Sequence, residues 1–169
     1  MKKILFFSIG LALLASCNNI NNEGLSRDEL IDSIETLDSL DAYDMVANPE
    51  KANEIIALFN QFVNQYPDDS LTPIYLMKMA ETQIALGEFE QGIANLDSII
   101  LRHPDFEDVA GCQFLKGWAY EQNEQYDEAR EAYTEFVTRY PDHVLAADVK
   151  KTLPLVGLSP EEQLKKVRS

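Results

Sequence analysis

Residues 126–142 read YDEAREAYTEFVTRYPD, and this stretch decides the fold of the chain. Its apolar side chains recur at steps of three and four residues, at Tyr126, Ala129, Tyr133 and Phe136. At 3.6 residues per turn these positions form one stripe on an α-helix. Pro141 then ends the helix, because proline lacks an N–H and pushes the residue before it out of the α region.

The Pro-Asp step that ends this stretch occurs three times at a fixed spacing of 37 residues, at Pro67, Pro104 and Pro141. A matching stripe precedes the other two prolines: Ala52, Ile55, Phe59 and Phe62 before the first, and Phe89, Gly92, Leu96 and Ile99 before the second. A fixed period of this length indicates a repeat array, in which no unit can bury its apolar face alone. The sequence therefore predicts an all-α protein built by stacking helical units.

The repeated unit resembles the tetratricopeptide repeat, a helix pair whose second helix carries an A-x3-F...P pattern. The third unit matches best, with signature residues at Gly117, Ala119, Tyr120, Tyr126, Ala129, Tyr133 and Pro141. The second unit has Ala80 in place of Gly117 and Gly92 in place of Ala129, and the first unit is weaker. The resemblance covers roughly residues 48–168. It implies a tetratricopeptide-like α-solenoid domain over residues 26–169, with about three helix pairs, a capping helix and a short C-terminal helix.

Capping residues and helix breakers predict the helix boundaries. Ser26 and Ser159 each begin a capping-box pattern, which satisfies backbone N–H groups at the start of a helix. Expected helices cover residues 26–40, 48–65, 71–86, 89–102, 107–122, 126–139, 145–153 and 159–167. Gly87 and residues 123–125 are expected to form the tight turns within units, and residues 41–46 either continue the first helix or break it.

The N-terminus has the layout of a secretory signal, with two lysines before an apolar run over residues 4–15. That run is too short to cross a bilayer as a permanent helix. It leads into Leu14-Ala15-Ser16-Cys17, which resembles the lipobox of bacterial lipoproteins. The resemblance implies that residues 1–16 are a signal peptide cleaved before Cys17, that Cys17 carries the lipid, and that residues 17–25 form a flexible spacer. An ordinary secretory signal with an incidental cysteine is the alternative.

The period of 37 residues rather than the usual 34, with helices that end in Tyr-Pro-Asp, resembles tetratricopeptide-type lipoproteins of Gram-negative envelopes. These include the β-barrel-assembly lipoprotein and the periplasmic coordinator of the Tol–Pal system. We expect an outer-membrane location, because Asn18 is not the aspartate associated with inner-membrane retention in such lipoproteins. We expect the protein to face the periplasm, because the early part of the spacer lacks acidic residues.

The charge of the mature chain restricts its partners. Residues 1–16 contain two of the 14 lysines and arginines and none of the 29 acids, so cleavage leaves 12 basic residues and a net charge of −17. This balance argues against nucleic-acid binding, which needs a basic footprint, and against docking of the folded domain on anionic lipid headgroups. It favours cationic partners, or it simply keeps the surface solvated and self-repelling.

In stacked tetratricopeptide units the first helix of each pair lines a concave face, so the resemblance implies a groove for a partner peptide. The side chains expected to point into the groove, away from the second helix, are Met77, Glu81 and Ile84 in the second unit and Phe114, Trp118 and Glu121 in the third. An aromatic anchor ringed by acids suits peptide binding. The alternative is that Phe114 and Trp118 only pack between helices.

Residues suited to catalysis or metal binding are few and scattered. His103 and His143 differ by three residues in their repeat positions, so stacking would not bring them together as metal ligands. The sequence contains no Gly-rich phosphate loop, nucleophile elbow or H-E-x-x-H motif. Cys112 has no base positioned by the spacing, and we expect it to be a small packed residue. The sequence thus predicts no enzyme, no metal and no cofactor apart from the lipid on Cys17.

Two functions remain. The first is a membrane-anchored scaffold in the bacterial envelope, which binds another envelope protein or a peptide, preferably a cationic one, in the concave groove. The second is a structural subunit of an outer-membrane complex, which stacks through its convex face or its ends without a peptide groove. The sequence does not identify the partner.

Overall fold

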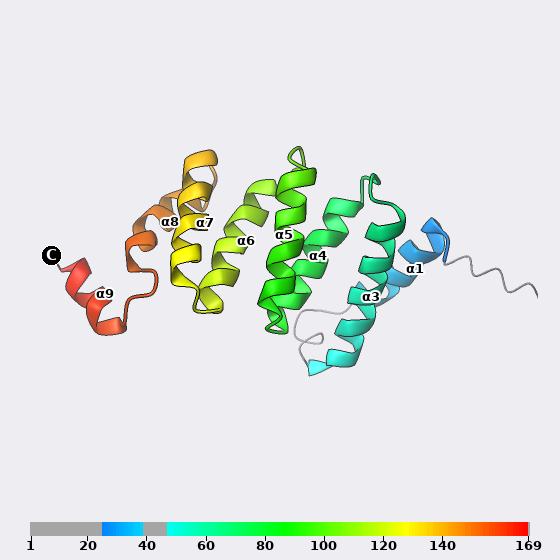
Figure 1. Cartoon of the computed structure of the whole chain (residues 1–169), viewed down its shortest axis with the longest axis horizontal. Helices are drawn as coiled ribbons and strands as arrows, with labels where there is room; N and C mark the ends of the chain where they lie inside the picture. Colours follow the sequence, from blue (N-terminus) through cyan, green and yellow to red (C-terminus); the bar gives the residue numbers. More distant parts are fainter. Residues whose placement is uncertain (1–24, 39–46, 169) are drawn as a thin grey trace, which may run out of the picture.

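The computed structural model describes residues 25–38 and 47–168, and this part of the chain is all-helical (Figure 1). Its elements are α1 (Arg27–Asp38), α3 (Pro49–Gln65), α4 (Thr72–Ala85), α5 (Phe89–Arg102), α6 (Val109–Gln122), α7 (Tyr126–Arg139), α8 (Ala146–Thr152), the 3₁₀ helix η1 (Leu153–Leu155) and α9 (Pro160–Val167). The predicted all-α fold and the order of its helices are confirmed. The signal peptide, Cys17 and residues 41–46 lie outside the described residues.

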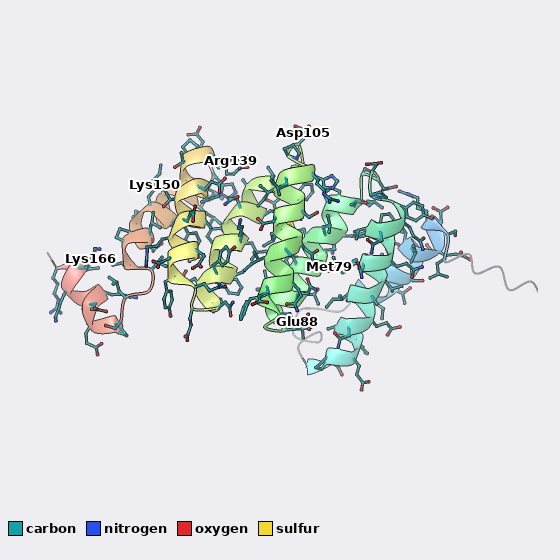
Figure 2. The ribbon with its side chains drawn as sticks, in the orientation of Figure 1. Met79, Glu88, Asp105, Arg139, Lys150 and Lys166 are labelled. Atoms are coloured by element: carbon teal, nitrogen blue, oxygen red, sulfur yellow. The ribbon has the colours of Figure 1, made fainter. Side chains whose placement is uncertain are left out.

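The helices stack in two rows (Figure 1). The first helices of the pairs, α4, α6 and α8, form one row, which we call the first-helix row. The second helices, α3, α5 and α7, form the second-helix row, and each helix from α3 to α8 packs on the next one in the chain. The turns within pairs lie along one edge and the junctions between pairs along the opposite edge, as Glu88 and Asp105 show in Figure 2. The predicted α-solenoid is therefore present.

Each Pro-Asp step forms the same junction between units. The residues before the prolines, Tyr66, His103 and Tyr140, have φ angles of −127°, −126° and −126°. Their backbone N–H groups donate to the carbonyl four residues earlier at 2.8, 2.8 and 2.9 Å. These angles recur because each proline excludes the α conformation from the residue before it. The backbone conformation thus repeats every 37 residues, as the sequence does.

The two helices of a pair approach closely where the sequence has its smallest side chains. In the second pair, Ala80 on α4 and Gly92 on α5 are buried, and a Cβ added to Gly92 would lie 3.1 Å from the carbonyl oxygen of Ala80. In the third pair the two residue types exchange helices, as Gly117 on α6 and Ala129 on α7. A Cβ on Gly117 would lie 2.6 Å from the ring of Tyr133. Each contact therefore depends on one glycine.

Stacking buries two apolar clusters rather than one core per unit. The first extends from α1 to α6 and includes Leu30, Phe59, Phe62, Leu96 and Ile99. The second joins α7 to α8 and to the segment after it, and includes Ala129, Tyr133, Phe136, Val149 and Val156. Tyr120 on α6 packs against both clusters. Neighbouring units therefore stabilise one another, as expected for a repeat array.

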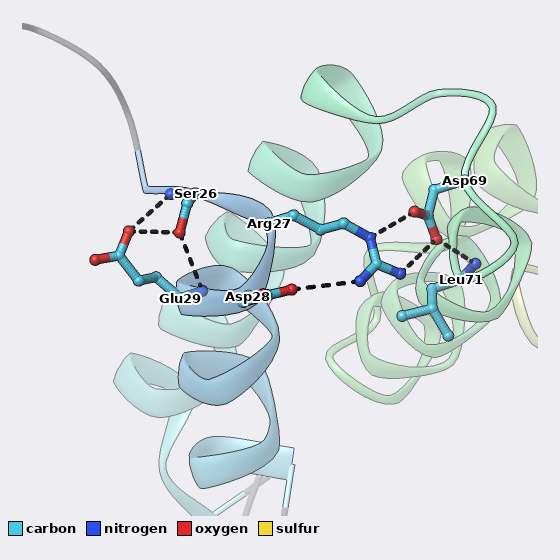
Figure 3. Close-up of polar contacts among 6 residues, drawn as sticks. All are labelled: Ser26, Arg27, Asp28, Glu29, Asp69 and Leu71. Carbon is cyan, nitrogen blue, oxygen red and sulfur yellow. Dashed lines mark hydrogen bonds and ion pairs between the residues drawn. The ribbon is translucent and has the colours of Figure 1, made fainter.

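The first helix, α1, is held at the N-terminal end of the array by packing and by one ion pair (Figure 3). The predicted capping box is present, since the backbone N–H of Ser26 donates to the Glu29 carboxylate at 2.9 Å. Nε and Nη2 of Arg27 donate to the carboxylate of Asp69, between α3 and α4, at 2.7 and 3.3 Å. Leu30 is completely buried. The register would place the start of this helix 37 residues before Thr72, at residue 35, so α1 lies outside the register.

The fourth unit is incomplete. Its first helix, α8, has only seven residues and passes at Leu153 into η1, in which Pro154 occupies the register position of Gly117. Gly157 then reverses the chain with a φ of 76°, a left-handed conformation that suits glycine. Ser159 caps α9 with the predicted capping box. Within the described residues, the helix that follows α8 and η1 is therefore α9, which has eight residues instead of the 14 of α5 and α7.

Candidate partner-binding pocket

Five of the six predicted groove residues have exposed or half-buried side chains, and three of these five lie on the first-helix row apart from the pocket described below. Glu81 on α4 is exposed, Met77 on α4 is half-buried, and Trp118 on α6 is 38 % exposed. Trp118 is therefore not a core residue, and an exposed tryptophan is a frequent anchor for protein partners. The pocket described below contains none of the three.

The other three predicted groove residues do not point away from the second helix, and this part of the prediction is wrong. Ile84 is 4 % exposed and lies over Gly92 on α5. The ring of Phe114 lies 5.8 Å from that of Tyr133 on α7. Glu121 accepts a hydrogen bond from the Tyr133 hydroxyl at 2.9 Å.

The error has a geometric cause. On a helix of about 3.6 residues per turn, seven steps fall roughly 20° short of two turns, whereas four steps pass one turn by roughly 40°. Glu121 is seven residues after Phe114, so these two side chains face the same way, toward α7. Trp118 is four residues after Phe114 and is rotated toward solvent. The predicted stripe was therefore too wide to be one exposed face.

Phe114 and Glu121 instead line a pocket of about 380 Å³ at the C-terminal end of the first-helix row. Its walls come from five elements or their ends, with Phe114 and Glu121 from α6, Tyr133 from α7, Leu145, Asp148, Val149 and Thr152 at α8, Leu155 and Val156 at η1, and Gln163 from α9. Most of these side chains are apolar, and two are carboxylates. The sequence predicted the two residues from α6 and missed the rest, of which Leu155, Val156 and Gln163 depend on how the chain turns after Pro154.

One hydrogen bond fixes a carboxylate in this pocket. Burial raises the pKa of Tyr133, and the hydrogen bond to Glu121 raises it further. Tyr133 therefore remains a protonated donor throughout the physiological pH range. Its hydroxyl holds Oε2 of Glu121, whereas Oε1 accepts no hydrogen bond within the described residues. Asp148, the second carboxylate, forms an exposed ion pair with Lys151 at 3.1 Å.

The residues that could carry other chemistry do not form a site. Cys112 is fully buried, and burial raises its pKa to about 12, so it remains an unreactive thiol. His143 accepts a backbone hydrogen bond from Leu145 at Nδ1 and lies against the Phe136 ring. Within the described residues, no group of three or more histidines, cysteines or acids is placed to hold a metal ion.

Comparison with known proteins identifies the repeated unit. Residues 75–105 and 112–143 each match the family described as the tetratricopeptide repeat. The two matches correspond to the pairs α4–α5 and α6–α7, so the structure and the family comparison divide the chain in the same way. A search of curated proteins gives no significant match.

Proposed function

We propose that this protein, which contains two tetratricopeptide repeats, is a membrane-anchored scaffold of the bacterial envelope that binds a segment of a partner protein along its first-helix row. Tetratricopeptide repeats generally mediate protein–protein interactions. The observation that carries the proposal is the pocket of about 380 Å³ on this row, with an apolar lining and two carboxylates. Trp118 on the same row adds an exposed anchor.

The anchoring part of the proposal is supported by the sequence of the N-terminus. The signal-like run and the lipobox-like residues 14–17 precede the array, and lipid on Cys17 would hold it at the membrane. Among the described helices, none is long and apolar enough to span a bilayer. We further propose the outer membrane, with the array in the periplasm, as the location.

The proposal assigns no catalytic step to the chain. Proteins with tetratricopeptide repeats are typically non-catalytic scaffolds. In this array the carboxylates of the pocket are accompanied by apolar side chains and a protonated tyrosine, and such a lining suits the binding of a side chain.

Co-isolation from solubilised membranes tests this function. The wild-type protein is compared with Trp118→Ala, on the first-helix row, and Leu101→Ala, on the second-helix row; each variant removes one exposed apolar side chain. We expect quantitative mass spectrometry to show partner proteins that are depleted by Trp118→Ala and retained by Leu101→Ala. No specific partner in any of the three samples would contradict a scaffold function.

One observation favours the second candidate, a structural subunit that stacks through its convex face. Leu101 on α5 is 78 % exposed on the second-helix row, where it could contact the surface of a neighbouring subunit. If Leu101→Ala removes the partners and Trp118→Ala retains them, the convex face is the interface and the second candidate is correct.

A further inference from the structure

We propose that the pocket between α6 and α8 binds a cationic segment of the partner, with one large apolar side chain inside the pocket and a neighbouring lysine or arginine at its carboxylates. This inference rests on the proposed function, that the array binds a partner protein. It adds the chemistry of the segment and the position at which that segment is held.

The repeat register explains why a pocket forms at this place. The helix pair α6 and α8 is equivalent, 37 residues later, to the pair α4 and α6. Leu115 packs against the first apolar cluster, and its register position one unit later holds the smaller Thr152, which lines the pocket. Helix α8 also ends at Thr152, the register position of Leu115, whereas α6 continues to Gln122. Less side-chain volume and a shorter helix leave the space open.

The register also shows a change in polarity. Ile84, buried in the second pair, is replaced by Glu121 in the third. Gly111 is replaced by Asp148. Each of the two substitutions places a carboxylate on the lining of the opened space. Positions held by Ile84 and Gly111 one unit earlier therefore carry negative charge on the lining of the pocket between α6 and α8.

The size and lining of the pocket limit what enters it. A volume of about 380 Å³ lies at the low end of the range of roughly 300–1,000 Å³ for ligand sites, which is enough for one or two side chains. Phe114, Leu145, Val149 and Leu155 supply apolar walls, so a bulky apolar side chain gains most from burial there. A single anchor residue of a partner segment fits these limits.

The charges select the residue beside the anchor. Within the part of the chain that the structure describes, Tyr133 holds Glu121 through one oxygen, which leaves the other available to a donor from outside. Among the same residues, the Asp148 carboxylate is paired only with Lys151, in a pair whose two side chains are 78 % and 76 % exposed, and such pairs exchange partners at little cost. The mature net charge of −17 also favours the approach of a cation over that of an anion.

Peptide binding to the full mature lipoprotein in detergent micelles tests the inference. The probe is a fluorescein-labelled peptide with one phenylalanine between two lysines, flanked by glycine and serine. In one control peptide serine replaces the phenylalanine, and in the other glutamates replace the lysines. We expect fluorescence anisotropy to show that the probe binds at least about tenfold more tightly than either control peptide, and less tightly as salt increases.

Variants of the protein locate the binding. Thr152→Leu introduces the larger leucine found at the equivalent position one unit earlier, and it should weaken probe binding about tenfold. Glu121→Gln keeps an acceptor for Tyr133 but removes the charge, and it should weaken binding about threefold to tenfold. Glu131→Gln makes the same change at an exposed site on α7 outside the pocket, and it should leave binding unchanged. Circular dichroism checks that each variant remains folded.

The inference is overturned if folded Thr152→Leu binds the probe as the wild type does, if the glutamate peptide binds equally well, or if no peptide binds. The co-isolation experiment separates this failure from a failure of the scaffold function. If partners remain bound to Thr152→Leu but are lost from Trp118→Ala, the scaffold function stands and the pocket is excluded as its binding site.

Discussion

Gly87 and Glu124, which are 37 residues apart, occupy the same left-handed turn position, with φ angles of 80° and 59°. The residue after each donates its backbone N–H to the carbonyl five residues before it, Glu88 to Gln83 at 2.8 Å and Gln125 to Tyr120 at 2.9 Å. The two turns within pairs therefore have the same backbone conformation and the same hydrogen bond. Only the first has the glycine that tolerates it without steric cost.

Replacement of Glu124 by glycine should stabilise the protein. A residue with a Cβ is destabilised by roughly 1–2 kcal/mol in the left-handed region, and glycine avoids this cost. Glycine also has more conformational entropy to lose from the unfolded chain, which cancels roughly half of that gain in stability. We expect Glu124→Gly to raise the free energy of unfolding by about 0.5–1 kcal/mol in chemical denaturation. Glu124→Ala, which removes the charge but keeps the Cβ, is the control. Equal stability of the two variants would mean that the turn is not strained.

Phe59 tests the packing between the first two pairs. Its ring is 1 % exposed, and its centroid lies 5.4 Å from that of Tyr75 on the next helix. Phe59→Ala leaves a cavity that the neighbouring helices cannot close, so we expect the free energy of unfolding to fall by about 3–5 kcal/mol. Leu101→Ala removes a side chain that is 78 % exposed and should change it by less than about 0.5 kcal/mol. Similar effects of the two substitutions would contradict the helix register.

The contact between Arg27 and Asp69 predicts a pH dependence of the docking of α1. The Arg27 guanidinium and the backbone N–H of Leu71 hold the pKa of Asp69 below its ordinary value. A lowered pKa in the folded state means that the stabilisation is complete above the unfolded value of about 3.9 and is lost as the pH falls through the folded value. The contribution should therefore be constant at neutral pH and disappear in acid.

Hydrogen exchange of the α1 amides measures this dependence. Above about pH 5, Asp69→Asn should exchange faster in α1 than the wild type, after correction for intrinsic rates, and the two proteins should converge as the pH falls below the lowered pKa of Asp69. The backbone N–H of Leu71 keeps an acceptor in the asparagine variant, so the difference reports the charge. A difference that persists unchanged in strong acid would show that Arg27 does not act through the carboxylate.

Periodicity predicted the residues that follow the 37-residue register, and the capping boxes at Ser26 and Ser159 predicted α1 and α9 outside it. Periodicity placed the helices α3 to α7 and the small residues at their contacts, because stripes and prolines act locally. The capping box at Ser26 predicted the start of α1, but the contact of Arg27 with Asp69, 42 residues away, does not follow from local sequence. The pocket was missed for the same reason, since Val156 and Gln163 reach it only after the break at Pro154 and the reversal at Gly157.

The candidate site was predicted in part. The sequence selected Phe114 and Glu121, and both line the pocket, but it assigned them the same face as Trp118. The difference in direction between residues four and seven apart on one helix decides which of them contacts the second helix. To make that distinction, one must know how each helix is rotated about its own axis. An apolar stripe that is shared by two faces of a helix does not define this rotation.

The anchor proposed at Cys17 is tested by fractionation. The wild-type protein should fractionate with membranes and carry the mass of a lipid on its first residue. Cys17→Ser should leave the chain uncleaved or mislocalised, because it removes the sulfur that would carry the lipid. If Cys17→Ser matures normally and is released with no change in mass beyond the lipid, the lipobox interpretation fails.

Position-specific photo-crosslinking in intact cells tests most directly that a partner lies in the pocket. A photoreactive amino acid replaces Thr152, which lines the pocket, or Thr138, which is exposed on α7 in the opposite row. We expect the Thr152 position to form a discrete adduct with a protein whose crosslinked segment carries a bulky apolar residue beside a lysine or arginine. The Thr138 position should form no such adduct. An adduct at Thr138 alone, or none at either position, would contradict this expectation.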